Sequence, residues 1–86
     1  MLKTGDTVRL LQAIDLSTAA HTILVPADTV GAVIEDLNEV VAKDNTRLPP
    51  HARDTRPRDL ALVRFAEYDA QGWLRYSEVA ACANQN

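Results

Sequence analysis

The stretch HTILVPADTVGAVIED, residues 21–36, decides the fold of this chain. Pro26 fixes φ and lacks a backbone donor, so the chain must turn there or follow a sheet edge. The β-branched residues that a half-buried strand prefers come next: Val30, Val33 and Ile34. Gly31 allows a bulge at a bend, and a bulge would let Val30 and Val33 face the same side. The stretch therefore predicts the central curved strand of a small β-barrel.

The segment before this strand divides into a strand and a long connection. From Thr7 to Gln12, Val8 and Leu10 alternate with outward-facing residues, the period-2 pattern of a strand with one buried face. Residues 13–22 mix Asp, Ser and Thr with small residues and show no clean period. We interpret them as a long excursion between strands.

The C-terminal third predicts a hairpin followed by a short closing strand. In the strand Leu60 to Ala66, the Val63/Phe65 face is the better core candidate. YDAQG, residues 68–72, reads as a hairpin loop that ends in a glycine able to adopt positive φ. Residues 73–76 then pair back, 77–79 form one helical turn, and 80–83 form the last strand. The predicted core is Val8, Leu10, Val30, Val33, Ile34, Val63, Phe65 and Val79.

The segment from Leu37 to Lys43 fits two structures. Asp36 followed three residues later by Glu39 resembles a capping box, and apolar residues at helical spacing predict a two-turn helix. A continued strand is the alternative, because so short a segment carries little periodicity.

Composition sets the class of protein. The 86 residues form one domain with an aliphatic core, because aromatic residues make up only 5% of the chain. The net charge of -3 argues against a dedicated nucleic-acid binder. Cys82 is the only cysteine, which suits a reducing compartment, and we find neither a secretory leader nor an apolar run long enough to cross a membrane. We expect a cytoplasmic protein.

Four motifs resemble, in the same order, those of a known group of small barrels. They are GDTVRLL at 5–11, VPADTVGAVIE at 25–35, LVRF at 62–65 and GWLRYSEVA at 72–80. The chain resembles the SH3-like barrels of short bacterial proteins and the C-terminal barrel of the nitrile hydratase β subunit. Asp28 stands where their pattern has glycine, and residues 45–59 have no counterpart. The resemblance implies an all-β, five-stranded SH3-like barrel with room for one short helix in an insertion, acting as an accessory or interaction module.

The segment 45–59, NTRLPPHARDTRPRD, is the first candidate binding element. It carries three prolines, His51 and four arginines, Arg47, Arg53, Arg56 and Arg58. Arginine forks suit phosphate or carboxylate groups, so the loop could contact an anion or RNA. The alternative is a solvated, mobile insertion that uses charge to stay soluble.

The second candidate is the aromatic group of the last hairpin, Tyr68, Trp73 and Tyr76. Strict alternation puts Trp73 and Tyr76 on opposite faces, so one of the two rings would be exposed, as is common at protein interfaces. A Trp that closes one end of the barrel is the alternative.

The chain offers little for catalysis. His21, His51 and Cys82 have no metal-ligand spacing, and the three glycines at 5, 31 and 72 form no phosphate-binding loop. We expect no enzyme activity, metal or cofactor. Three functions stay open: a module that binds another protein or itself, a small nucleic-acid-binding barrel that uses the arginines, and a non-catalytic subunit of a nitrile-hydratase-like enzyme whose metal site lies on a partner chain.

Overall fold

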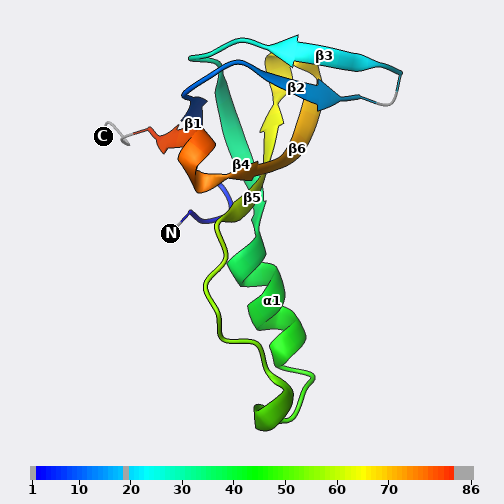
Figure 1. Ribbon diagram of the computed structural model, residues 1–86, viewed down its shortest axis with the longest axis vertical. Coiled ribbons are helices and arrows are strands. Elements are labelled where there is room, and N and C mark those ends of the chain that lie inside the picture. Colours follow the sequence, from blue (N-terminus) through cyan, green and yellow to red (C-terminus); the bar gives the residue numbers. More distant parts are fainter. Residues whose placement is uncertain (1, 19, 83–86) are drawn as a thin grey trace.

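The chain forms a strongly curled antiparallel sheet, a separate hairpin and a projecting helical arm (Figure 1). The computed structural model describes residues 2–18 and 20–82. Five strands make the sheet in the order β6-β5-β4-β1-β7. Their bounds are β1 Thr7–Leu10, β4 Val30–Asp36, β5 Leu60–Phe65, β6 Ala70–Arg75 and β7 Val79–Ala81. The molecule is mostly β with one short α-helix.

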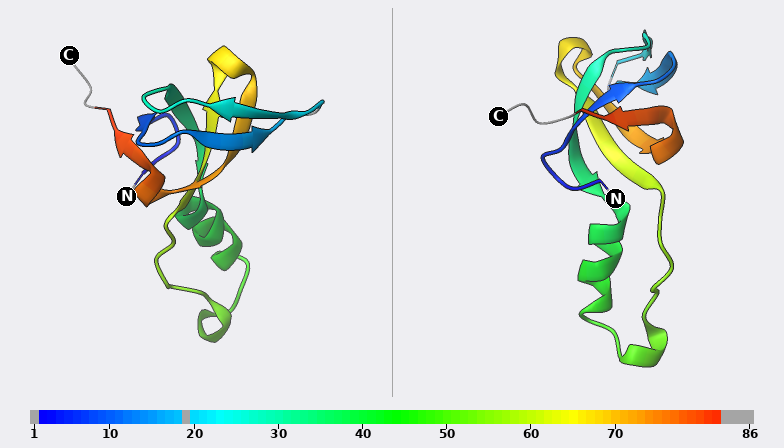
Figure 2. Two further views of the ribbon diagram at one scale, coloured as in Figure 1. Left: turned by 45° about the horizontal axis from the view of Figure 1, so that its top comes forward. Right: turned by 90° about the vertical axis from the view of Figure 1, so that its left-hand side faces the viewer.

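The prediction of five strongly bent antiparallel strands is confirmed, but the sheet is a half-barrel and does not close into a barrel. Across the described ranges, β6 pairs only with β5 and β7 pairs only with β1, and no ladder joins these two outer strands. The excursion predicted for residues 13–22 is instead largely a hairpin of β2, Ile14–Ser17, and β3, Thr22–Val25. These two strands pair with each other and pack across the concave side of the sheet (Figure 2). They cover the core without extending the sheet.

The core lies inside this curl, between the sheet and the hairpin. Six of the eight predicted core residues are buried: Val8, Leu10, Val33, Val63, Phe65 and Val79. Leu16 and Val25 of the hairpin, Leu74 and Ala70 of β6, Ala61 of β5 and Leu2 also belong to it. Of the other two predicted residues, Ile34 is half-buried and Val30 is 54% exposed. The core is aliphatic apart from Phe65 and half-buried tyrosines at its margin.

Val30 points outward because the bulge in β4 is not where the sequence predicts it. Val30, Gly31 and Ala32 pair in regular register with β1, and the register with β5 shifts only between Val33 and Glu35. Gly31 therefore faces inward, where a Cβ would lie 2.7 Å from side-chain atoms of Phe65 and Val63. Close packing, and not a bulge, requires the glycine.

Asp28 occupies the position of positive φ in the turn before β4. Asp28 has φ 69°, in the left-handed region that glycine favours and that Asp tolerates better than most residues. Its N–H donates to Leu10 O at 2.8 Å, and its carboxylate lies 2.6 Å from Arg9 Nη1. The turn thus uses Asp at a position whose backbone conformation favours glycine.

The open choice for residues 37–43 resolves as helix. α1, Leu37–Asn45, follows β4 without a loop, and no residue of it is fully buried. With residues 46–59, here called the return segment, it forms an arm that projects from one end of the sheet (Figures 1 and 2). A short 3-10 turn, Pro50–Ala52, lies at the tip of the arm. The arm accounts for much of the 42 Å length of the molecule.

The last hairpin turns earlier than the sequence predicts. A 3-10 turn, Ala66–Tyr68, is followed by Asp69 at φ 50°, so this residue supplies the left-handed position. Gly72 lies inside β6, where a Cβ would meet Leu16 Cδ2 at 2.7 Å. The predicted helical turn is present at Tyr76–Glu78 and leads into β7; the predicted end of that strand at Ala83 lies outside the described residues.

Candidate functional site

The arm is joined to the half-barrel at Asp36, the fully buried last residue of β4. Because of the bulge, two successive residues lie away from the core: Ile34 is half-buried and Glu35 is exposed. Asp36 then points to the inner side of the sheet. Its carboxylate accepts from the N–H of Asn38 at 2.9 Å and so caps α1. It also accepts from Asn38 Nδ2 at 2.9 Å and from the hydroxyl of Tyr76. One carboxylate thus ties together strand, helix and C-terminal turn.

Tyr76 packs at the edge of the core with its hydroxyl directed at this junction. Burial raises the pKa of Tyr76 above its ordinary value of 10.0, and the hydrogen bond to Asp36 raises it further. The capping box predicted from Asp36 and Glu39 is half right. Asp36 caps the helix, but Glu39 reaches instead to Thr4, whose N–H and Oγ1 donate to its carboxylate at 3.2 and 3.0 Å.

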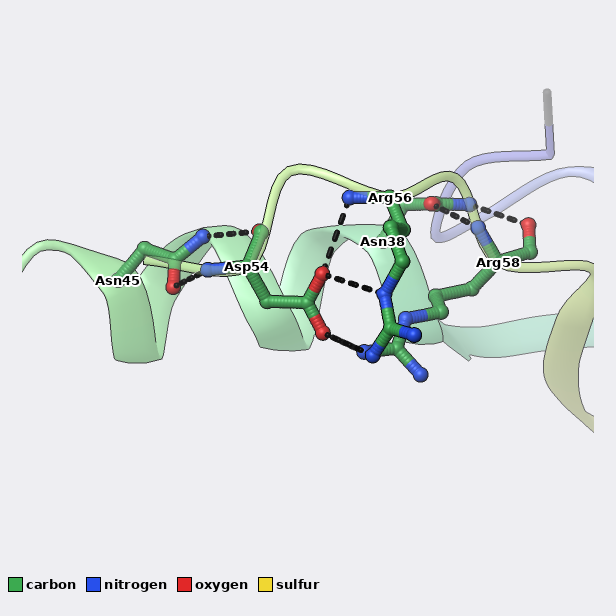
Figure 3. Close-up of polar contacts among 5 residues, drawn as sticks. All are labelled: Asn38, Asn45, Asp54, Arg56 and Arg58. Carbon is green, nitrogen blue, oxygen red and sulfur yellow. Dashed lines mark hydrogen bonds and ion pairs between the residues drawn. The ribbon is translucent and has the colours of Figure 1, made fainter. Parts of the chain in front are cut away.

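Two asparagines hold the return segment against α1 (Figure 3). Asn38 Nδ2 donates to Arg58 O at 2.9 Å, and Asn38 Oδ1 accepts from Arg58 N at 2.7 Å. About two turns further along the helix, Asn45 Nδ2 donates to Asp54 O at 2.6 Å, and Asn45 Oδ1 accepts from Asp54 N at 3.1 Å. Each side-chain amide takes the place of a neighbouring strand's peptide group. The two residues are seven positions apart, hence on one helical face.

Asp54 gathers two of the four candidate arginines. Its carboxylate accepts from the N–H of Arg56 at 3.0 Å and from Arg56 Nη2 at 3.2 Å, and it pairs with Arg58 Nη2 (Figure 3). The hydrogen bonds from Arg56 lower the pKa of Asp54 from 3.8 to about 2, and Asp54 in turn raises the pKa of Arg56. These guanidinium groups already have an anionic partner within the chain.

The other two candidate arginines lie towards the tip of the arm, with His51. Arg53 Nε donates to Leu48 O at 2.9 Å, which braces the turn. Arg47, Arg53 and His51 are all exposed. The structure therefore divides the arginines into an Asp54-bound pair and a tip pair, and it does not assemble the four into one basic surface.

The three candidate aromatic residues do not form one cluster. Tyr76 packs at the base of the arm, whereas Tyr68 packs on the core at the turn before β6 and lines a hollow with His21 and Asp69. Trp73 alone is strongly exposed, at 45%.

Trp73 lies on the convex face of the half-barrel, in a row that crosses three strands. The register pairs Trp73 of β6 with Leu62 of β5, and Leu62 with Glu35 of β4. Cross-strand partners on one face are close neighbours, so the indole ring lies beside the half-buried Leu62, and Leu62 is followed by the bulge of β4, which carries Ile34 and Glu35. We call Trp73, Leu62 and Ile34 the outer row.

The described residues contain no group of three or more His, Cys, Asp or Glu side chains that could hold a metal ion. Over the same ranges no helix is long and apolar enough to cross a membrane.

Of the residues that organise the arm, Asp36 was predicted from sequence as a helix cap, whereas Asn38 and Asn45 were not singled out. The available signal was the repeat of asparagine after seven residues, a spacing that puts both side chains on one face of a helix. That repeat indicates a polar face that must find backbone partners.

Comparison with known proteins finds no matching family model, no matching curated protein and no matching solved structure. The chain is a small, mostly β protein with a curled five-strand antiparallel half-barrel.

Proposed function

We propose that this chain is a non-catalytic protein-interaction module on an SH3-like half-barrel, and that the outer row is its contact surface. The observation that carries the proposal is the 45% exposure of Trp73 beside Leu62 on a face that no other element covers among the described residues. Trp is enriched where protein interfaces carry most of their binding energy, because one large ring buries much apolar area at low entropic cost.

The flanking residues fit such a surface. Arg75 and Gln71 of β6 and Arg64 of β5 lie on the same face as Trp73, so the apolar row is bordered by polar side chains. An apolar centre with a polar rim is the usual anatomy of a protein interface.

The test compares capture of proteins from the source cell by three forms of the full chain. Trp73→Ala removes the ring, and Leu24→Ala is the matched control, because Leu24 is 61% exposed on β3, away from the outer row. A partner retained by the wild type and the control but lost with Trp73→Ala supports the proposal. A partner that Trp73→Ala retains equally would contradict it.

A second measurement reports the site directly. Trp73 is the only tryptophan, so its fluorescence reports one position. Binding of the purified partner should shift its emission to shorter wavelength as water leaves the ring. An unchanged spectrum at saturating partner would place the contact elsewhere.

Nucleic-acid binding through the arm is the alternative function. The exposed tip arginines and the 80% exposed side chain of Arg56 favour it, while the capture of two guanidinium groups by Asp54 weighs against it. Phosphate-driven binding should weaken steeply between low and moderate salt, whereas contact through Trp73 should change little.

A further inference from the structure

A hollow of about 370 Å³ lies beside α1, and its lining combines an apolar floor with charged walls. Ile34 and Val40, both half-buried, supply the apolar part. Thr4, Glu35, Glu39, Lys43 and Asp44 complete the lining. The return segment lines a different hollow, with Asn38, Val41, Ala42 and Asn45 of the helix. The side of α1 that carries Val40 thus has no covering element among the described residues.

Four of the charged residues along this side form a stripe that changes sign once, at regular spacing; Asp44, beside Lys43, lies outside this spacing. Glu35, Glu39, Lys43 and Arg47 follow one another at intervals of four residues. Steps of four keep Glu39 and Lys43 on one side of α1, and Glu35, near the end of β4, lines the same hollow. Past the end of the helix, the N–H of Arg47 bonds to Asp44 O at 3.1 Å, so the chain there continues the last turn. The base of this stripe is acidic and its outer end is basic.

Within one copy these charges find little compensation. Glu39 is directed to Thr4 and makes no ion pair with Lys43, although the spacing would allow one. The ion pairs formed by the described residues join Arg9 to Asp28, Arg56 and Arg58 to Asp54, and Arg64 to Asp69. None of them involves Glu35, Lys43 or Arg47.

We propose that a second copy of this chain covers the hollow, with the two arms side by side and antiparallel. Reversal of the stripe against itself places Glu35 opposite Arg47 of the other copy, and Glu39 opposite Lys43. Every such contact occurs twice, because a two-fold interface presents the same patch from both sides. The apolar floor around Val40 is covered at the centre.

The charge pattern of the stripe favours a second copy over an unrelated protein. One end of the stripe is acidic and the other is basic, so two stripes in antiparallel orientation place opposite charges together. A wholly acidic or wholly basic partner would meet like charge along half of its length. The contact is confined to one arm, so the interface is small and the dimer is weak and concentration-dependent. Of the outer-row residues only Ile34 also lines this hollow, and the residues changed in the test below, Glu35 and Arg47, are not in that row, so the inference stands or fails separately from the proposed function.

The test measures the mass of the purified full chain by sedimentation across a wide range of concentration. We expect a reversible monomer–dimer equilibrium that weakens as salt increases. Glu35→Lys and Arg47→Glu should each weaken dimerisation at least about tenfold, because each places like charges together twice. Both side chains are exposed, and far-UV circular dichroism of each variant checks that it folds.

An equimolar mixture of the two variants is the decisive sample. In a mixed dimer, Lys at 35 meets Glu at 47, and Glu35 of the other copy meets Arg47, so both contacts are attractive again. We expect the mixture to dimerise like the wild type. Glu67→Lys, an equal change of charge at an exposed site in the 3-10 turn before β6, should leave dimerisation unchanged.

Three results would overturn the inference. A wild-type chain that stays monomeric across the whole range shows that the hollow is not covered by a second copy. Dimerisation that neither Glu35→Lys nor Arg47→Glu weakens shows that another surface is used. Variants that stay monomeric when mixed show that the residues at 35 and 47 do not meet.

Discussion

Gly31→Ala should destabilise the fold through a steric clash inside the core. An added Cβ would lie 2.7 Å from both Phe65 Cε1 and Val63 Cγ1, closer than carbon atoms approach without a shift. Phe65 and Val63 are fully buried, so neither can move aside freely. Overpacking of this kind costs about 1 to 3 kcal/mol. Replacing a strand glycine by alanine otherwise gains about 0.5 to 1 kcal/mol, so the net loss is about 1 kcal/mol and at most about 2.5 kcal/mol.

Gly72→Ala is the matched control, because it adds the same group to another strand. Its Cβ would meet Leu16 Cδ2 at 2.7 Å, but the next atom is 3.9 Å away, so rotation of one flexible side chain relieves the contact. Thermal unfolding followed by circular dichroism measures both variants, with about 4 to 8 °C expected per kcal/mol for a domain of this size. Our description of the core is refuted if Gly31→Ala melts with the wild type, or if Gly72→Ala loses more than Gly31→Ala.

Three further predictions concern the arm and its junction. Because the folded-state pKa of Tyr76 lies above its unfolded value of 10.0, its stabilisation is complete below pH 10 and is lost as the pH rises through the folded-state pKa. Tyr76→Phe should therefore lose less unfolding free energy than the wild type as the pH rises above 10, as measured by urea unfolding at a series of pH values. For Asp54, whose pKa is lowered, the stabilisation is complete above pH 3.8 and is lost as the pH falls towards about 2. Asp54→Asn should therefore reduce the loss of unfolding free energy at acid pH in the same urea series. Asn38→Ala should open the return segment, so that trypsin cuts after Arg58 sooner than in the wild type; equal cleavage rates would show that the Asn38 contacts do not hold the segment.

Local patterns predicted the strands well where a single face is buried. The alternation of Val8 with Leu10, and of Val63 with Phe65, identifies two inner faces correctly, because burial on one face imposes a period of two. The turn before β4 was also predictable, since Pro26 and a residue at positive φ define it.

The errors arise where long-range contacts decide. A bulge reverses which residues face inward, and its position depends on the partner strand, so Val30 was assigned to the core when it points to solvent. Closure of the barrel depends on ladders between strands far apart in sequence, and the β2–β3 hairpin satisfies its own hydrogen bonds instead. Neither the position of the bulge nor the closure of the barrel can be predicted from the composition of one segment.

The candidate site was predictable only in part. Alternation indicated that either Trp73 or Tyr76 is exposed, and Trp73 is the exposed ring. The composition of residues 45–59 predicted a mobile loop, and proteolysis has still to test that motion. Composition does not reveal that Asn38 and Asn45 supply this segment with backbone partners.

The contacts of Asn38 with Arg58 and of Asn45 with Asp54, here called the clamps, also limit how the arm can change length in evolution. Seven helical residues advance about 10.5 Å, at about 1.5 Å each. The four extended residues between their partners advance about 13 Å, at about 3.3 Å each. A longer arm that keeps the clamps must therefore add residues to both sides together, about seven in the helix for four in the return segment. An insertion on one side alone is accommodated only at the tip, between Thr46 and Arg53, which makes the tip the natural place for variation in length.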